Sequence, residues 1–388
     1  MAASETQVRS CIVKIDGKTQ VEGTSGGGSS PTFAARLESV QVDKRLDAPD
    51  MFLLDLDLRQ DAQLLLVDDL KEGKTIEILL GPVGAEKQVF KGEIDYIEPH
   101  YRHEGTSTLL LGGYDPSHRL TRGTSSKTWG DGVQQQDLLP TAVRDVINNA
   151  QEVQGTRDGL SARKVDVPRA RTAYIPQFNV SDWHFIRWLG QDVDRVVDAD
   201  AAADPKQLSF APPDVNREPR RVLVREAPRG EKERLIKEAR FQLNTVRQVS
   251  RVEVRGWDPK HKKAIVGTAT DAAWRLPGKP GWEATGEALY GKGSAGKVLT
   301  ITDRPVDSQE EAEAIAKAVF TQLSLDYLTA EIDYEGDPEV TAGDIVEVRG
   351  FGKRFDGRYL VAGCTQEMVP RTIGYVTHLR LARNTVAE

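Results

Sequence analysis

Six histidines are the side chains of this chain that could most readily hold a metal ion or move a proton near neutral pH. His100 and His103 form an H-x-x-H pair beside Pro99. A zinc hydrolase needs such a pair on a helix, with a glutamate and a third ligand, and the neighbouring sequence supplies none of these. The other four histidines are expected at two surface turns (His118, His261), on a helix flank (His184) and on a strand face (His378). We therefore predict no metal site and no catalytic dyad.

A glycine- and lysine-rich segment, residues 291–298, comes close to the P-loop pattern that cradles nucleotide phosphates. Val298 stands where that pattern has the serine or threonine that binds Mg²⁺. Residues 299–302 predict a strand, whereas phosphate binding there needs the N-terminus of a helix. This segment is not expected to bind a nucleotide.

A run of aspartates between residues 192 and 204 could suggest a calcium site. The run lacks the glycine and the closing glutamate of an EF-hand loop, so a solvated acidic loop is the better interpretation. The aspartates are Asp192, Asp194, Asp198, Asp200 and Asp204.

Nucleophile patterns are also missing from the sequence. It contains no G-x-S-x-G elbow, and its two cysteines, Cys11 and Cys364, have neither a metal-type nor a redox-type spacing. We predict that the chain is not an enzyme and binds no cofactor.

Length and composition limit the classes of protein that remain possible. A chain of 388 residues exceeds the roughly 100–200 residues of one domain, so two or three domains are expected. The formal net charge of −7 argues against nucleic-acid recognition, because phosphate binding needs a surplus of lysine and arginine. No segment reaches the ~18 uncharged apolar residues of a membrane helix, and the N-terminus lacks the features of an export signal. We expect synthesis in the cytoplasm and no stable membrane insertion.

Short strands separated by glycine- or proline-bearing turns dominate residues 1–120. Leu54, Leu56 and Leu58 alternate with Asp55 and Asp57, which is the period of a half-buried strand. A glycine- and serine-rich stretch at 21–31 is expected to be a long loop between early strands. We predict that residues 1–120 form a first β domain, a small antiparallel β-barrel or sandwich.

Helical patterns appear in residues 121–218. One helix is expected to open near Pro140, and a second begins after Ser181, a good N-cap, with Phe185, Ile186 and Leu189 on one face. This part of the chain is predicted to be a mixed α/β middle domain.

Residues 219–388 are predicted to form a second β domain with an inserted helix at 308–327. Ser308 and Glu311 have the spacing of a capping box, and an apolar stripe follows them. Strands are expected again near residues 345–348, 359–362 and 375–381.

The two β-rich ends of the chain resemble each other. Residues 73–78 match residues 343–348 in spacing and type, and Phe90-Lys91-Gly92 is echoed by Phe355-Asp356-Gly357. Chance similarity between short β patterns is one explanation, and a duplicated β-barrel is the other. A duplication would let three subunits present six similar lobes, so a threefold assembly could match a sixfold partner.

A second repeated pattern is a glycine, an aromatic residue, Asp-Pro, any residue, histidine and a basic residue. It occurs at residues 113–119 and again at 256–262. Because it falls outside the first register, we interpret it as a recurring turn.

The segment from Gln177 to Ile186 resembles the late control protein D family of contractile phage tails, which includes the hub half of VgrG spike proteins. The family typically has Q-x-N-E-S-D-W-x-F followed by isoleucine or leucine at the start of a helix. Seven residues match it and are candidates for packing or interface roles: Gln177, Asn179, Ser181, Asp182, Trp183, Phe185 and Ile186. Val180 replaces the usual glutamate, and Asp194-Arg195 stand where the family's helix often ends near a glycine.

Other segments agree with this resemblance. Residues 342–348 and 355–361 are similar to the family's closing strands, and residues 374–381 to its final strand. Residues 47–52 and 73–78 resemble the first barrel of hubs from phage-tail-like injection systems.

The resemblance implies a structural baseplate hub, mainly β with an α+β middle domain. Two tail-tube-like barrels per subunit would assemble as a homotrimer with pseudo-sixfold symmetry. That ring would join a hexameric inner tube to a trimeric spike, expected as a separate chain, and would contact other baseplate proteins of a phage tail or tail-like particle. Two alternatives are a tail-associated cell-wall hydrolase and a monomeric receptor- or carbohydrate-binding β module.

Overall fold

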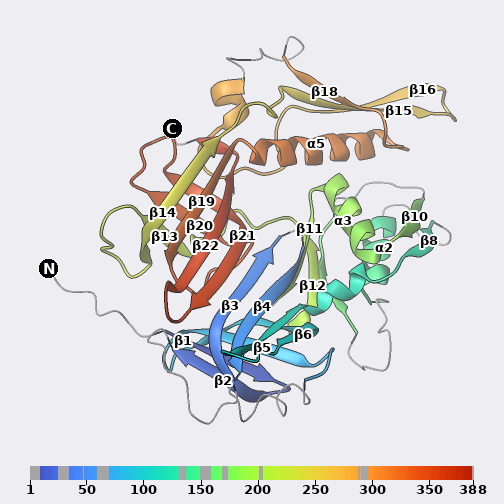
Figure 1. Ribbon diagram of the computed structural model, residues 1–388. Coiled ribbons are helices and arrows are strands. Elements are labelled where there is room, and N and C mark those ends of the chain that lie inside the picture. The colour runs from blue at the N-terminus through green and yellow to red at the C-terminus, as the bar shows by residue number, and fades with distance from the viewer. Residues whose placement is uncertain are drawn as a thin grey trace.

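Two β lobes lie side by side and share one thirteen-stranded sheet, and a mixed α/β part and a helix-backed sheet flank them (Figure 1). The computed structural model describes residues 9–24, 35–46, 48–58, 70–130, 137–148, 159–167, 174–200, 204–286, 289 and 296–386. The predicted loop at 21–31 and the P-loop-like residues 291–295 fall largely or wholly outside these ranges. None of the described helices is long and apolar enough to cross a membrane.

The first lobe contains seven strands, and every neighbouring pair among them is antiparallel. Along the chain they are β1 (Arg9–Ile15), β2 (Lys18–Thr24), β3 (Ala35–Arg45), β4 (Ala48–Leu58), β5 (Thr75–Pro82), β6 (Lys87–His100) and β7 (Ser107–Tyr114). Their order in the sheet is β2-β1-β5-β6-β7-β4-β3. As the alternation predicts, Leu54, Leu56 and Leu58 are buried while Asp55 and Asp57 are half-buried.

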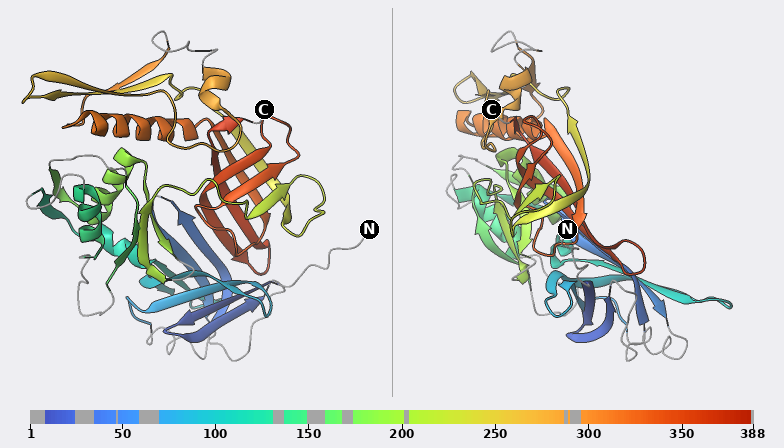
Figure 2. Two further views of the ribbon diagram at one scale, coloured as in Figure 1. Left: turned by 180° about the vertical axis from the view of Figure 1, so that it is seen from behind. Right: turned by 90° about the vertical axis from the view of Figure 1, so that its left-hand side faces the viewer.

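The antiparallel character of the first lobe was predicted correctly. Within the described ranges, no strand pairing joins β2 to β3, although the two strands lie close together, so closure of this lobe into a barrel stays a prediction. Figure 2 shows the first lobe as a strongly curved sheet below the second.

The second lobe is a closed barrel of six strands. They are β13 (Arg221–Val224), β14 (Glu233–Leu243), β19 (Leu328–Glu335), β20 (Ile345–Arg349), β21 (Gly357–Val369) and β22 (Gly374–Arg383). The order β21-β20-β13-β14-β19-β22 returns to β21 and closes the ring. The prediction of a purely antiparallel barrel is wrong here, because β13 runs parallel to both β14 and β20.

Strand β21 belongs to both lobes. Its first residues, from Gly357 to Leu360, pair with β20 and close the second barrel. Its later residues, from Gly363 to Met368, pair with β3 over Arg45 to Val40. The two lobes are therefore connected by backbone hydrogen bonds as well as by side chains.

A middle region of two small sheets and two helices follows the first lobe. It contains η1 (Pro116–Thr121), β8 (Ser125–Trp129), α2 (Leu138–Asn148), β9 (Ser161–Val165), β10 (Ile175–Val180), α3 (Asp182–Val193), β11 (Val196–Asp200) and β12 (Asp204–Ala211). Strand β10 pairs with β8, and the second sheet has the order β11-β12-β9. Both helices bury apolar residues in one shared core. The mixed composition agrees with the prediction, whereas the boundaries at 120 and 218 stay predictions.

An insertion separates β14 from β19 in the second barrel. It contains β15 (Arg251–Asp258), β16 (Lys263–Ala269), β17 (Lys279–Pro280), the π-helical turn η3 (Trp282–Gly286), β18 (Val298–Ile301) and α5 (Gln309–Leu325), and β17 pairs with β23 (Thr385–Val386). Ser308 caps α5 by accepting a hydrogen bond from the Glu311 N–H, as the capping box predicts. Helix α5 lies directly on the sheet β16-β15-β18, and a Cβ atom at Gly267 would lie 2.1 Å from the Ala312 carbonyl carbon. Only glycine permits this approach.

Candidate functional site

Both lobes open the corresponding hairpin with the same glycine turn. Gly73 precedes β5 and Gly343 precedes β20, with φ of +80° and +84°. The Gly73 N–H donates to the Ile94 carbonyl and the Gly343 N–H to the Val361 carbonyl, both at 2.8 Å. A left-handed φ is strained for other residues, which explains the repeated glycine.

A β-bulge recurs at the next equivalent position. In β6 the register shifts between Ile94 and Tyr96, and in β21 it shifts between Val361 and Gly363. Ile94 and Val361 are the residues whose carbonyls accept from the glycine turns, so turn and bulge coincide in both lobes. A bulge bends and twists a strand, and a shared bulge gives both sheets the same local curvature.

These two landmarks fix how the halves superimpose. The strands β5-β6-β7 and β20-β21-β22 follow each other in the same antiparallel order, as the sequence similarity predicted. Ile76 pairs with Gly92, and its counterpart Val346 pairs with Tyr359. The predicted alignment of Gly92 with Gly357 is therefore wrong by two residues, since Gly92 corresponds to Tyr359.

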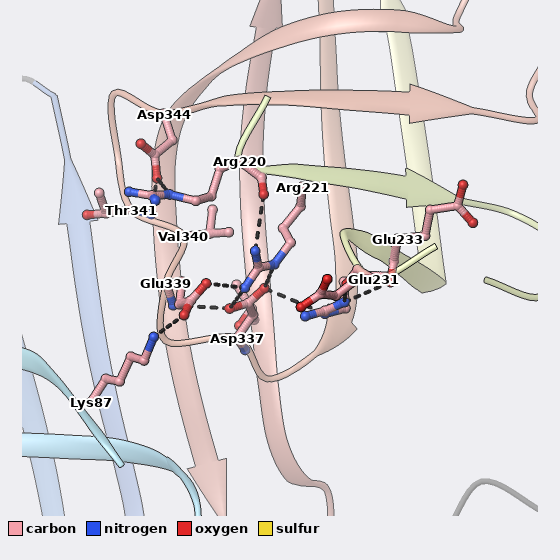
Figure 3. A network of polar contacts seen from close by, with 12 residues as sticks. Lys87, Arg220, Arg221, Glu231, Glu233, Asp337, Glu339, Val340, Thr341 and Asp344 are labelled. Carbon is pink, nitrogen blue, oxygen red and sulfur yellow. Dashed lines mark hydrogen bonds and ion pairs between the residues drawn. The ribbon is translucent and has the colours of Figure 1, made fainter. Parts of the chain in front are cut away.

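An ionic network joins the lobes where β6 meets the loop between β19 and β20 (Figure 3). Lys87 of the first lobe contacts Glu339 of the second, and Glu339 also lies 2.5 Å from Nη2 of Arg221. The Arg221 guanidinium donates to both carboxylate oxygens of Asp337, at 2.5 and 3.2 Å. Arg221 and Asp337 are 9% and 4% exposed, so this pair is held away from water. Hydrogen bonds from Lys87 and then Arg221 lower the pKa of the Glu339 carboxyl to about 2.

Side chains around the shared strand β21 add to this connection. Asp43 of β3 accepts from Thr365 at 2.8 Å and from Arg380 at 2.9 Å. Arg9 of β1 pairs with Glu335 of β19 at 2.8 Å. Nothing in the sequence pattern singled out these residues, since each is an ordinary polar or charged side chain whose partner lies far along the chain.

Three of the seven motif residues fix the turn into α3. The Ser181 hydroxyl accepts from the His184 N–H at 3.2 Å, which confirms Ser181 as the N-cap. Gln177 is 2% exposed and donates to Asp182 at 2.8 Å and to the Val180 carbonyl at 3.1 Å. These residues thereby form hydrogen bonds with one another across the turn between β10 and α3.

The other four motif residues attach this segment to its neighbours. Asn179 has φ of +49° and accepts from the Thr124 hydroxyl at 2.9 Å. Phe185 stacks on Trp129, with ring centroids 5.2 Å apart, and Ile186 and Trp183 are buried in the same core. All seven residues have packing contacts within this chain, and a role in an interface stays a prediction.

One of the predicted polar sites differs in the structure. Asp194, predicted in a solvated loop, is 9% exposed and caps α3 in the left-handed conformation, with φ of +57°. Burial raises the pKa of its carboxyl to about 6. Within the described ranges, no three His, Cys, Asp or Glu side chains gather so that they could hold a metal ion.

The two repeated turns also differ from each other. His261 is exposed as predicted, and its Nδ1 lies 2.5 Å from Asp258. His118, predicted at the surface, is buried, with Nδ1 2.6 Å from the Asp115 carbonyl and Nε2 3.4 Å from Asp95. In both turns the aspartate accepts from the backbone N–H two residues later, at 2.6 Å (Asp115) and 2.9 Å (Asp258). The recurring-turn interpretation therefore holds, while one of its histidines is in the interior.

A cavity of about 640 Å³ opens between α3, the end of α5 and the outer wall of the second barrel. Its lining mixes aromatic residues, including Trp183 and Trp274, with charged side chains of both signs such as Arg240 and Glu331.

Solved structures share this fold over nearly the whole chain. A 43 kDa tail protein of prophage MuSo2 from Shewanella oneidensis matches with a TM-score of 0.66 and 15% identity, covering 97% of this chain and 98% of that one. A tail protein from Neisseria meningitidis MC58 matches with a TM-score of 0.63 and 14% identity, covering 97% of each chain. A type VI secretion component from E. coli, described as structurally similar to T4 bacteriophage tail proteins gp27 and gp5, matches with a TM-score of 0.56 and 10% identity over 95% of this chain and 76% of that one.

Sequence comparison gives a family. No curated protein matches the chain. The family model described as the Alg8 N-terminal domain matches residues 18–369, which span both β lobes, the middle region and the insertion. That name is not the late control protein D family of the predicted resemblance, and it states no activity. The chain thus has the fold of phage tail proteins and belongs to the Alg8 N-terminal domain family.

Proposed function

We propose that this protein is a structural baseplate hub, a homotrimer that joins a hexameric inner tube to a trimeric spike in a contractile tail or tail-like injection system. In this proposal it has no enzymatic activity and works through its contacts with tube, spike and other baseplate proteins. It is made in the cytoplasm and assembled into the particle.

The observation that carries the proposal is the structural repeat within one chain. The glycine turns at Gly73 and Gly343, the bulges after Ile94 and Val361, and the strand orders that follow them coincide. Three such chains around a threefold axis would present six related lobes, and an adaptor between sixfold and threefold partners needs that arrangement.

The continuity of the lobes supports the same role. Strand β21 and the network around Arg221 hold the two lobes at a fixed angle within one subunit. In a ring of related lobes, each must keep its orientation relative to the next. A pair of lobes on a flexible linker would not give this spacing.

The solved relatives of this fold agree with a role in a tail. They include two tail proteins and a component of the type VI secretion system. A further similar chain, of which this chain covers 66%, comes from a PdpA-VgrG complex. These proteins motivate the choice of tube and spike as partners.

The test is electron-microscope class averaging of the purified protein, alone and coexpressed with the spike encoded near it. We expect threefold rings with six similar lobes and a central opening. Particles of one-chain mass, even with the spike present, would contradict the hub and favour a monomeric binding module. Release of soluble fragments from purified peptidoglycan, lost on substitution of one carboxylate, would favour a hydrolase instead.

A further inference from the structure

The hairpin of β15 and β16 ends in a basic, aromatic tip. We term residues 257–263 (Trp-Asp-Pro-Lys-His-Lys-Lys) the basic finger. Its three lysines are exposed, and Trp257 is 60% exposed. Figure 1 shows the hairpin projecting past the end of α5, away from the second barrel.

The finger is apolar on one side as well as basic. Helix α5 covers one face of the sheet β16-β15-β18, and Trp257 and Val266 lie exposed on the opposite face. Arg255 on that face is also exposed and is directly opposite Val266. An exposed tryptophan beside arginine and lysine is the composition of an interface hot spot, not of an ordinary solvated hairpin.

A complementary surface lies on the outer wall of the second barrel. We term it the acidic wall, and it consists of Glu238 on β14, Glu331, Asp333 and Glu335 on β19, and Glu367 on β21. Basic groups on the same wall are Arg9, Arg240, His378 and Arg380, and the exposed Lys237 precedes Glu238 at the bulge of β14.

Part of this negative charge is not balanced within the subunit. Glu238 is directly opposite Asp333 in the β14–β19 ladder, and two like charges in such a pair repel each other. Asp333 has His378 at 2.8 Å, while the described residues provide no ion pair for Glu238. Glu331 differs, because both of its cross-strand neighbours, Arg240 and Arg380, are basic. A cation from outside the subunit would relieve the repulsion at Glu238.

We propose that the basic finger of one subunit docks on the acidic wall of the next subunit in the ring, and this inference rests on the proposed homotrimer. Lys260, Lys262 and Lys263 face the carboxylates, and Trp257 supplies the apolar anchor. The hairpin projects away from the second barrel of its own chain, so the contact joins two different surfaces of two copies. Such a head-to-tail contact closes into a ring, which an isologous contact would not do for three copies.

A cysteine crosslink tests the contact directly. Both native cysteines, Cys11 and Cys364, are buried, so they do not compete with engineered thiols at the surface. Lys262→Cys and Glu238→Cys are made as separate chains, mixed during assembly and oxidised. We expect a disulfide-linked dimer only in the mixture, and covalent trimers when one chain carries both substitutions.

Charge reversal gives an independent readout. Lys260→Glu, Lys262→Glu and Lys263→Glu together are expected to weaken trimer formation about 100-fold in mass measurements at low salt, because interfacial like charges are strongly unfavourable. The partner reversal, Glu238→Lys with Asp333→Lys, is expected to restore the trimer. A matched control reverses three exposed lysines elsewhere, Lys71, Lys127 and Lys353, and should assemble normally.

The outcomes separate this contact from the hub itself. A wild-type trimer that tolerates the finger reversal and forms no crosslink would overturn the docking and leave the hub proposal intact. A reversed finger that still trimerises but loses the tube protein would assign the finger to that partner, which also overturns it. A wild-type chain that never trimerises contradicts the proposed function, and with it the basis of this inference.

Discussion

The two β lobes share the same glycine turn, bulge and strand order, but their interiors contain different side chains. The interior of the first lobe is apolar, with Phe90 lying across Gly92, whose Cβ would be 2.6 Å from the ring. In the second barrel an aromatic residue, Tyr359, occupies the position of Gly92, and the buried Arg383 lies over its ring at 5.5 Å. Two positions on the same face of this strand therefore hold an aromatic residue and a glycine in opposite order in the two lobes.

Buried polar groups on β21 and β22, where the second barrel meets the core of the first lobe, extend this difference. Gln366 is 1% exposed and accepts from the hydroxyls of Tyr375 and Thr377, while its amide donates to the Asp337 carbonyl. Such a network has a defined geometry only when every member has a partner. The comparison teaches that the repeat preserves the turn and bulge, which set curvature, and leaves the contents of each lobe free to diverge.

The largest expected effect comes from removing a buried carboxylate of the second barrel. Asp337→Ala leaves the Arg221 guanidinium buried without its bidentate partner, which should cost about 4 kcal/mol of unfolding free energy. Urea denaturation measures it. Glu347→Ala removes one partner of the exposed Arg349 pair and is the control, with an expected cost below about 1 kcal/mol. Equal losses of unfolding free energy in the two variants would contradict the dependence of the second barrel on buried polar groups.

The next effect tests the first lobe, where Gly113 occupies the position of Leu381 in the second barrel. A Cβ at Gly113 would lie 1.9 Å from the Glu93 carbonyl oxygen, so Gly113→Ala must displace backbone and should cost about 3 kcal/mol. The adjacent Gly112→Ala meets only the Leu53 side chain, at 3.2 Å, and should cost well under half as much. If thermal unfolding shows the two variants to be alike, the close strand approach assigned to this lobe is wrong.

A third measurement uses the single cysteine in each lobe. Burial raises the pKa of both thiols, that of Cys364 to about 12, so neither should react while its lobe stays folded. We expect Cys11, on β1 beside the terminal strand β2 of the sheet, to be alkylated about 10-fold faster than Cys364, on strand β21 of the closed barrel, a difference of about 1.4 kcal/mol in local opening. Mass spectrometry after timed labelling gives both rates from one sample. Equal rates would mean that the lobes open as one unit.

The smallest expected effect is a loss of folding stability at acidic pH. Because the folded pKa of Glu339 is about 2, below the ordinary 4.5, its contribution is complete above about pH 4.5 and is lost as the pH falls toward 2. Glu339→Gln should flatten this part of the stability profile by no more than about 1 kcal/mol, since the group is partly exposed. Chemical denaturation between pH 5 and 2.5 measures the slope. A Glu347→Gln control with the same flattening would show that the link through Lys87 is not responsible.

Local signals predicted much of this fold. The capping box at Ser308, the N-cap at Ser181 and the alternation from Leu54 to Leu58 act over a few residues, and each element formed as expected. The strand order of the repeat followed from the similarity between residues 73–78 and 343–348, although the alignment of its next segment was wrong by two residues. The parallel strand β13 was not predicted, because four residues hold no information about the direction of a distant neighbour.

The network between the lobes was beyond reach of the sequence for a similar reason. Arg221 and Asp337 lie 116 residues apart, and neither stands in a motif. His118 and Asp194 were predicted in solvent because polar residues usually are, and tertiary packing placed them inside. The finger at Trp257 was visible as a turn, whereas its exposure and the opposed carboxylates of the acidic wall needed the assembled sheet.

The strand that both lobes share also sets an order of events during synthesis. The outer edge of β3, from Val40 to Arg45, pairs with residues of β21 that leave the ribosome more than 300 residues later. At ~5–20 residues per second, that edge waits some tens of seconds with its backbone groups unpaired. An exposed edge is a template for pairing with other chains. We therefore expect a fragment that ends before β21 to aggregate, and its rescue by a peptide of residues 357–369 would identify this edge as the cause.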